Sequence, residues 1–229
     1  MAVSFKALTG AVFVYVTMAP LALAESPVQI TTSSQRVNTR VVSLLEMRER
    51  NLVRQGWDMS CGAAALSTVL GYHFGAEYSE ATIAATILSN TDPDRIRARG
   101  GFSLLDLKRF AEAVGYSANG YANLALEDLA AANVPAILPV RIRNLDHFVV
   151  FRGRVAGKVL IGDPAFGNLT MSERRFAKVW TNGIGFLVKS VEAEAPTWRS
   201  EDATALTVPD LNYVYRFGAT ARPVPVTRR

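Results

Sequence analysis

Three residues have side chains that could cooperate in nucleophilic catalysis: Cys61, His147 and Asp163. A free thiol has a pKa of about 8.5, and both a helix N-terminus and a nearby imidazolium favour its thiolate form. Cys61 begins a run of good helix formers, with Ser60 placed to cap the helix and Gly71 to end it. We therefore expect Cys61 in the first turn of a helix, where it could act as a nucleophile.

The chain has only two histidines, which narrows the choice of a catalytic base. His73 lies twelve residues after Cys61, about 18 Å away along one continuous helix. We interpret His73 as structural. His147 opens a predicted strand from a polar loop, where a side chain can face a cleft, so it is the candidate base.

An imidazole that acts as a base also needs its second nitrogen oriented, usually by a carboxylate or an amide. Asp163 ends the strand that follows the His147 strand, so a hairpin would place the two side chains together. The tetrahedral oxyanion needs donors, and the backbone N–H of Cys61 could supply one. The side chain of Gln55, six residues upstream, could supply another.

Each of these residues also has a structural interpretation. A lone Cys61 is more often a buried small residue, Gln55 alone is a surface residue, and Asp163 before a proline is a common turn former. A metal site made of Cys61, His147 and Asp163 lacks the closely spaced ligand pairs of zinc sites, so we predict no metal and no cofactor. Only the combination of residues favours catalysis.

The expected elements divide the domain into a helical half and a sheet half. Helices are predicted at residues 61–70, 79–88, 103–114 (with a capping box of Ser103 and Asp106) and 126–132, and a surface loop at 90–101. Strands are predicted at 136–142, 147–152, 158–161 and 184–188, with a helix at 172–179. This order predicts an α+β fold in which the nucleophile helix packs on an antiparallel sheet.

We predict four segments along the chain. Residues 1–24 have a basic residue, an apolar stretch and a small-x-small ending typical of a signal peptide, and residues 25–40 form a polar extended arm. A peptidase domain at 41–190 and a C-terminal extension of unknown role at 191–229 follow. Export predicts a periplasmic or secreted protein without stable membrane insertion after signal cleavage. The only cysteine is Cys61, so no intramolecular disulfide can form.

The charge of the chain is mildly basic. The formal net charge is +5, and removal of Lys6 with the signal peptide leaves +5 − 1 = +4. Two arginine groups lack the interleaved aromatic residues of a nucleic-acid interface, so we predict no nucleic-acid partner. We interpret them as a solvated face, formed by Arg48, Arg50, Arg54, Arg95, Arg97 and Arg99.

Three motifs carry a family resemblance: QGWDMSCG from Gln55, HFVV from His147 and GDP from Gly162. In this order they resemble the double-glycine leader peptidases, the bacteriocin-processing cysteine peptidases of the papain-like clan. The resemblance spans residues 54–189. It implies a papain-like fold and peptide-bond hydrolysis, with Gln55 as oxyanion donor, Cys61 as nucleophile, His147 as base and Asp163 as orienting carboxylate.

Two features depart from this family. Many members have Asp directly before the catalytic Cys, where this chain has Ser60, and the familiar members are cytosolic domains fused to an ABC exporter. We therefore predict a stand-alone exported cysteine endopeptidase that acts on an exported peptide or protein, with Gly-Gly-like sites implied by the resemblance. The alternatives are a cell-wall peptide amidase and an inactive peptidase-like binding module. The oligomeric state is not predicted.

Overall fold

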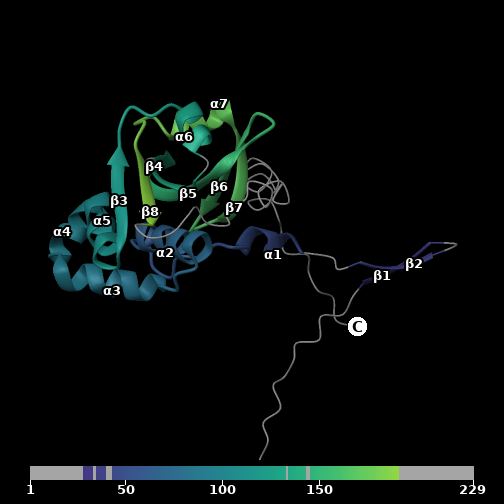
Figure 1. Cartoon of the computed structure of the whole chain (residues 1–229), viewed down its shortest axis with the longest axis horizontal. Helices are drawn as coiled ribbons and strands as arrows, with labels where there is room; N and C mark the ends of the chain where they lie inside the picture. Colours follow the sequence, from purple (N-terminus) through teal and green to yellow (C-terminus); the bar gives the residue numbers. More distant parts are fainter. Residues whose placement is uncertain (1–27, 33–34, 40–42, 133, 143–144, 191–229) are drawn as a thin grey trace, which may run out of the picture. The chain divides into compact units, whose positions relative to one another are not determined.

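The computed structural model describes residues 28–32, 35–39, 43–132, 134–142 and 145–190 (Figure 1). The chain divides into two units, residues 1–41 and 42–229. In the first unit β1 (Val28–Thr32) pairs antiparallel with β2 (Gln35–Thr39), so the predicted arm is a hairpin where it is described. The predicted signal peptide (1–24) and C-terminal extension (191–229) lie outside the described residues.

The second unit is built on a six-stranded sheet in the order β3-β8-β4-β5-β6-β7, and all its neighbouring strands pair antiparallel. Its strands are β3 (Tyr116–Tyr121), β4 (Ala136–Ile142), β5 (Leu145–Val155), β6 (Lys158–Asp163), β7 (Gly167–Ser172) and β8 (Gly185–Ser190). The four strands that the sequence predicts are therefore present, with longer or shifted ends in three of them. Strands β3 and β7 were not predicted.

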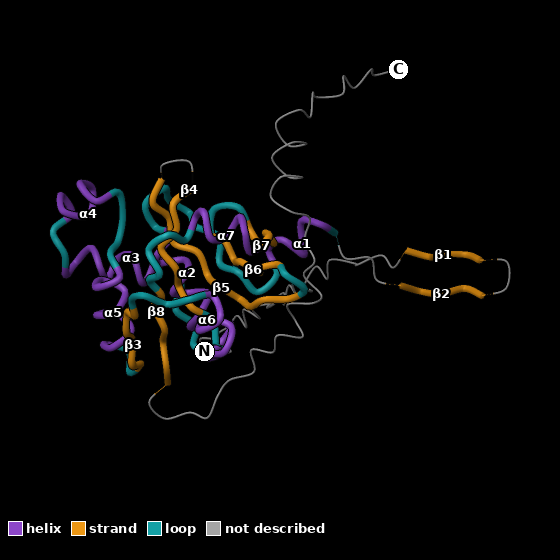
Figure 2. The backbone as a smooth tube through the Cα atoms, turned by 90° about the horizontal axis from the view of Figure 1, so that it is seen from above, coloured by secondary structure: helices purple, strands orange, loops and turns teal. Residues whose placement is uncertain are grey.

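Helices cover both faces of this sheet. The helices described in this unit are α1 (Leu44–Glu49), α2 (Cys61–Phe74), α3 (Glu80–Asn90), α4 (Pro93–Arg99), α5 (Leu104–Ala113), α6 (Leu126–Ala132) and α7 (Glu173–Val179). Figures 1 and 2 show α3, α4 and α5 grouped beside β3. The predicted α+β arrangement, with the Cys61 helix packed on an antiparallel sheet, is confirmed.

The apolar core has two parts because successive strand residues point to opposite faces of a sheet. Ile137 and Val150 belong to the cluster that contains residues of α2, α3 and α5. Their neighbours Leu138 and Val149 belong to the cluster that contains residues of α6 and α7. Strands β4 and β5 are therefore buried on both faces, which fixes the position of the strand that carries His147.

The predicted surface loop at residues 90–101 is wrong, because the segment contains helix α4 (Pro93–Arg99). Asp92 is its N-cap and accepts a hydrogen bond from the N–H of Asp94 at 2.9 Å, and Pro93 occupies the first turn. Gly100 ends the helix with φ of 76°. These residues, which we interpreted as turn formers, are equally the start and stop signals of a short helix.

Helix α2 is longer than predicted. It passes Gly71 and ends at Gly75, whose left-handed conformation (φ of 71°) lets its N–H reach the carbonyls of the last turn. Ser60 is the N-cap residue, but its side chain makes no capping hydrogen bond, so this part of the prediction is wrong. His73 lies in the last turn of the same continuous helix as Cys61 and is 4% exposed.

Candidate active site

Cys61 is the first residue of α2 and is 8% exposed. The first hydrogen bond at this helix end runs from the N–H of Ala64 to the carbonyl of Ser60 at 2.9 Å. The N–H groups of the first turn before Ala64 therefore have no partner within the helix, and the helix dipole adds a partial positive charge there. Negative charge on the thiol, or on an oxygen next to it, is stabilised at this position.

A glycine lets α2 approach the strand that carries the candidate base. A Cβ at Gly62 would lie 3.2 Å from Cδ2 of Phe148 and 3.4 Å from Cδ1 of Leu107. The distance to Phe148 is tighter than ordinary van der Waals contact, so a side chain at residue 62 would force Phe148 to shift. Because Gly62 follows Cys61 and Phe148 follows His147, this contact brings the two candidate catalytic residues together.

His147 and Asp163 form a hydrogen-bonded pair from adjacent strands. Nε2 of His147 lies 2.8 Å from Oδ1 of Asp163, and their side chains are 14% and 1% exposed. Oδ1 also accepts the backbone N–H groups of Ala165 (2.8 Å) and Phe166 (3.1 Å). The carboxylate is thus fixed by the turn that follows β6 and holds the imidazole in one orientation.

The surroundings of His147 favour its protonated form. Burial alone would lower the pKa of His147, but hydrogen bonds to the side chains of Asp163 and Cys61, together with their negative charge, outweigh it and raise the pKa from 6.5 to about 10. Nε2 of His147 is hydrogen-bonded to Asp163, so Nδ1 is the ring nitrogen available to the Cys61 thiol. The arrangement can hold an imidazolium next to a thiolate at neutral pH.

His73 has the opposite environment. Burial lowers the pKa of His73 from 6.5 to about 4, so this imidazole is neutral at physiological pH. Its ring packs edge-on against Phe74, with the ring centroids 4.6 Å apart. The structure places His73 in the core at the end of α2 opposite to Cys61, which agrees with its interpretation as a structural residue.

Gln55 lies beside the turn that follows Asp163. Its backbone N–H donates to the carbonyl of Pro164 at 3.0 Å, and its Nε2 donates to the carbonyl of Trp57 at 3.0 Å. Exchanging the amide oxygen and nitrogen would set two oxygens against each other, so the contact with Trp57 fixes the amide orientation. Among the described residues Oε1 of Gln55 is buried without a hydrogen-bond partner. Nε2 carries a second hydrogen that an oxyanion could accept.

Two arginines hold this turn, which corrects their interpretation as a solvated face. Nε of Arg54 donates to the carbonyl of Pro164 at 3.1 Å, and Nη2 of Arg48 donates to the carbonyl of Phe166 at 2.5 Å. Gly167 permits the close approach, because a Cβ there would lie 2.8 Å from the carbonyl oxygen of Arg48. The arginines therefore fix the backbone next to Asp163 in addition to contributing charge.

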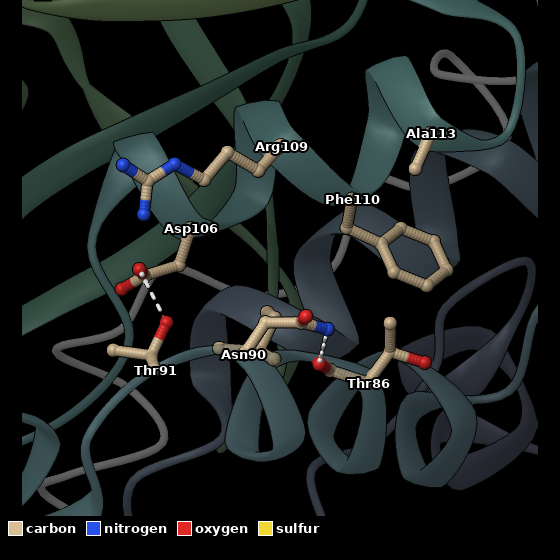
Figure 3. Close-up of a pocket in the computed structure, with 8 residues that line it drawn as sticks. Thr86, Asn90, Thr91, Asp106, Arg109, Phe110 and Ala113 are labelled. Carbon is tan, nitrogen blue, oxygen red and sulfur yellow. Dashed lines mark hydrogen bonds between the residues drawn. The ribbon is translucent and has the colours of Figure 1, made fainter.

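Two pockets lie near the helices. An apolar pocket of about 510 Å³ borders the loop before Cys61 and is lined by Trp57, Met59, Ser60, Ala81, Ala84, Ala85, Leu88, Ile96 and Phe102. A pocket of about 350 Å³ between α3 and α5 includes Asp106 and Arg109, with Thr91 bonded to Asp106 at 3.2 Å (Figure 3). In the described part of the chain, no three His, Cys, Asp or Glu side chains are placed to hold a metal ion.

The model of the peptidase C39 family matches residues 49–192. The chain belongs to this family. The matched region contains all four predicted site residues, and the predicted resemblance to double-glycine cysteine peptidases of the papain-like clan is confirmed. The family match does not identify individual catalytic residues, so the roles of Gln55, Cys61, His147 and Asp163 stay predictions that rest on their geometry.

Two Pseudomonas proteins with the same name are similar to this chain in sequence. The chain is 41% identical over 152 residues to a "Probable functional amyloid protease FapD" of Pseudomonas aeruginosa, covering 66% of each chain. It is 40% identical over 149 residues to the protein of that name from Pseudomonas fluorescens, covering 65% of each chain. The match thus spans just under two thirds of the length of these relatives.

Two solved structures confirm the fold of the domain. The peptidase domain of Streptococcus ComA, a bifunctional ABC transporter, has a TM-score of 0.50 and 28% identity, covering 61% of this chain and 97% of that domain. A double-glycine motif protease from an AMS/PCAT transporter, solved with a leader peptide, has a TM-score of 0.51 and 25% identity, covering 61% and 91%. The predicted papain-like peptidase fold is confirmed.

Proposed function

We propose that this C39 peptidase is an exported cysteine endopeptidase with Cys61 as its nucleophile. The observation that carries the proposal is the ordered contact from Asp163 through His147 to Cys61 at the N-terminus of α2. A cysteine nucleophile, an imidazole base and a carboxylate that orients the base are the components of a cysteine protease site.

The proposed reaction begins with attack of the Cys61 thiolate on a peptide carbonyl carbon. The backbone N–H of Cys61 and the side-chain amide of Gln55 stabilise the oxyanion of the tetrahedral intermediate. The intermediate collapses by breaking the C–N bond, and the His147 imidazolium gives its proton to the leaving amine. His147 then takes a proton from water as the water attacks the thioester, the C–S bond breaks, and the Cys61 thiolate beside the His147 imidazolium is regenerated.

The proposed substrate is an exported protein with a Gly-Gly-like cleavage site. The Pseudomonas relatives are named probable functional amyloid proteases, and one similar structure is a double-glycine motif protease bound to a leader peptide. We therefore infer that the substrate belongs to a functional amyloid system. The signal-like residues 1–24 support export. No helix in the described part of the chain is long and apolar enough to cross a bilayer.

The proposal is tested by incubating the purified protein, with and without Cys61→Ala, with exported proteins encoded near its gene and with a peptidoglycan preparation. We expect cleavage of a protein after Gly-Gly, detected by mass spectrometry, and loss of cleavage when that site is changed to Val-Val. Release of wall peptides alone would favour an amidase. Binding without turnover that Cys61→Ala leaves unchanged would favour a binding module. Either result would contradict the proposal.

The pH profile of Asp163→Asn tests the proposed role of the carboxylate. The pKa of His147 is raised to about 10, so the general acid is lost only as pH rises through about 10. Asn removes the negative charge that raises this pKa, so we expect the alkaline limb of kcat/KM to move down by at least about one pH unit. The matched control is Asp146→Asn, because Asp146 is exposed and pairs with Arg141 at 3.4 Å. An unchanged limb in Asp163→Asn would contradict the role.

A further inference from the structure

Glu80 is a buried carboxylate that no predicted role uses. It is the first residue of α3, is 9% exposed, and follows the N-cap Ser79, whose hydroxyl accepts the N–H of Thr82 at 3.1 Å. The carboxylate of Glu80 accepts the backbone N–H of Gly56 with both oxygens, at 2.9 Å to Oε1 and 3.0 Å to Oε2. It therefore bonds to a loop 24 positions earlier in the chain.

A second contact ties the same carboxylate to the other end of that loop. The hydroxyl of Ser60 lies within hydrogen-bonding distance of Oε1 of Glu80 and 2.7 Å from the carbonyl of Trp57. The hydroxyl has one proton to donate, and a charged acceptor makes the stronger hydrogen bond. The oxygen of the same hydroxyl accepts the N–H of Trp57 at 3.3 Å, so the Ser60 side chain bonds to Glu80 and the loop and makes no capping bond in α2.

The two anchored residues lie next to the two proposed oxyanion donors. Gly56 follows Gln55, whose amide is the side-chain donor, and Ser60 precedes Cys61, whose N–H is the backbone donor. The loop between them is otherwise exposed, with Trp57 at 55% and Met59 at 41%. An exposed loop needs a fixed attachment to hold a precise geometry. Glu80 supplies that attachment at both ends.

The charge of Glu80 is compensated by hydrogen bonds and by the helix. Among the described residues no Lys, Arg or His forms a salt bridge with Glu80. Its negative charge instead faces the N–H of Gly56 and the hydroxyl of Ser60, at the N-terminus of the 11-residue helix α3. The Glu80 carboxylate therefore holds the loop between Gly56 and Ser60 through hydrogen bonds.

We propose that Glu80 is a positioning residue that sets the geometry of the oxyanion hole through Gly56 and Ser60. This role rests on the proposed peptidase function. Glu80 touches neither the substrate nor the reacting atoms, and it acts by holding the loop that joins Gln55 to Cys61. Its removal therefore affects the transition state for hydrolysis, which carries an oxyanion, more than it affects chemistry at the thiol that forms no oxyanion.

The test compares peptide hydrolysis with alkylation of Cys61 by iodoacetamide in the wild type, Glu80→Ala and Glu80→Gln. For Glu80→Ala we expect kcat to fall on the order of 10² -fold, KM to change less than about threefold and the alkylation rate to stay within about threefold. Glu80→Gln keeps one carbonyl acceptor for Gly56, so we expect it to recover part of kcat. The matched control is Glu77→Ala, because Glu77 is exposed on the segment before α3 and should leave all three quantities unchanged.

Several outcomes would overturn the role. A kcat of Glu80→Ala equal to that of the wild type would show that Glu80 has no such role. If kcat and the alkylation rate fell equally and in proportion to the folded fraction, Glu80 would act only on folding. If Glu80→Ala does not fold, Ser60→Ala removes one of the two attachments, and a kcat equal to that of the wild type would count against the role. A wild type without hydrolysis overturns the proposed function itself, whereas an active wild type matched by Glu80→Ala overturns only the role of Glu80.

Discussion

Cys61→Ala is expected to lower kcat/KM for peptide hydrolysis by roughly 10⁴-fold or more, because no other thiol in the chain can replace the nucleophile. The measurement is cleavage of the Gly-Gly-containing substrate followed by mass spectrometry. Cys61→Ser should be nearly as inactive, since a hydroxyl of the same shape is a far weaker nucleophile beside a protonated imidazole.

The fold should survive both changes at Cys61. The residue is 8% exposed at the start of α2, and each substitute is no larger than the thiol that it replaces. We therefore expect far-UV circular dichroism and the thermal midpoint to stay close to those of the wild type. A folded Cys61→Ala variant that retains hydrolysis within tenfold of the wild type would show that the reaction does not pass through the thiol.

His147→Ala is expected to lower kcat by on the order of 10³-fold or more, because one imidazole both stabilises the thiolate and protonates the leaving amine. His147→Gln keeps most of the volume but cannot be protonated near neutral pH, so we expect a similar loss. Single-turnover cleavage with excess enzyme separates this effect on chemistry from any change in substrate binding.

The other histidine is the matched control. His73→Gln changes a neutral, buried imidazole at the far end of α2 and should leave kcat of the folded protein near that of the wild type. Its cost should appear in thermal stability, since His73 is 4% exposed. Equal losses of kcat in folded His73→Gln and His147→Ala would contradict the assignment of His147 as the base.

Local signals account for the parts of the fold that the sequence predicted well. Helix α5 has a capping box in which Ser103 Oγ accepts the N–H of Asp106 at 3.2 Å and Asp106 Oδ2 accepts the N–H of Ser103 at 2.8 Å. Residues 136–140 of strand β4 form a continuous apolar run, as expected for a strand buried on both faces. Both elements are specified by residues within their own span.

The unpredicted strands depend on distant partners. β3 (YSANGY) and β7 (GNLTMS) have weak strand patterns of their own. β3 is placed by pairing with β8, 64 to 74 positions later, as in Tyr116↔Ser190 and Tyr121↔Gly185. In β7 the buried Asn168 is satisfied by the backbone carbonyls of Met47 and Arg50, at 3.1 Å and 2.8 Å. Tertiary contacts here outweigh local propensity.

The candidate site could be predicted from the sequence because cysteine and histidine are rare in this chain. One cysteine and two histidines allow few pairs, and the hairpin order of the strands places Asp163 beside His147. Glu80 gave no comparable signal, since an acidic residue after Ser79 is a common start of a helix. Its contact with Gly56 depends on how α3 packs beside the loop, which the pattern of residues does not contain.

The most direct test of the catalytic pair is the pH dependence of Cys61 alkylation, followed by intact mass in the wild type and in His147→Ala. With a single thiol in the chain, the mass change reports one site. At pH 6, where a free thiol with a pKa of about 8.5 is almost fully protonated, we expect the wild type to react at least about tenfold faster than His147→Ala. Equal rates in the two folded proteins, or no reaction in either, would contradict the thiolate–imidazolium pair and with it the proposed peptidase mechanism.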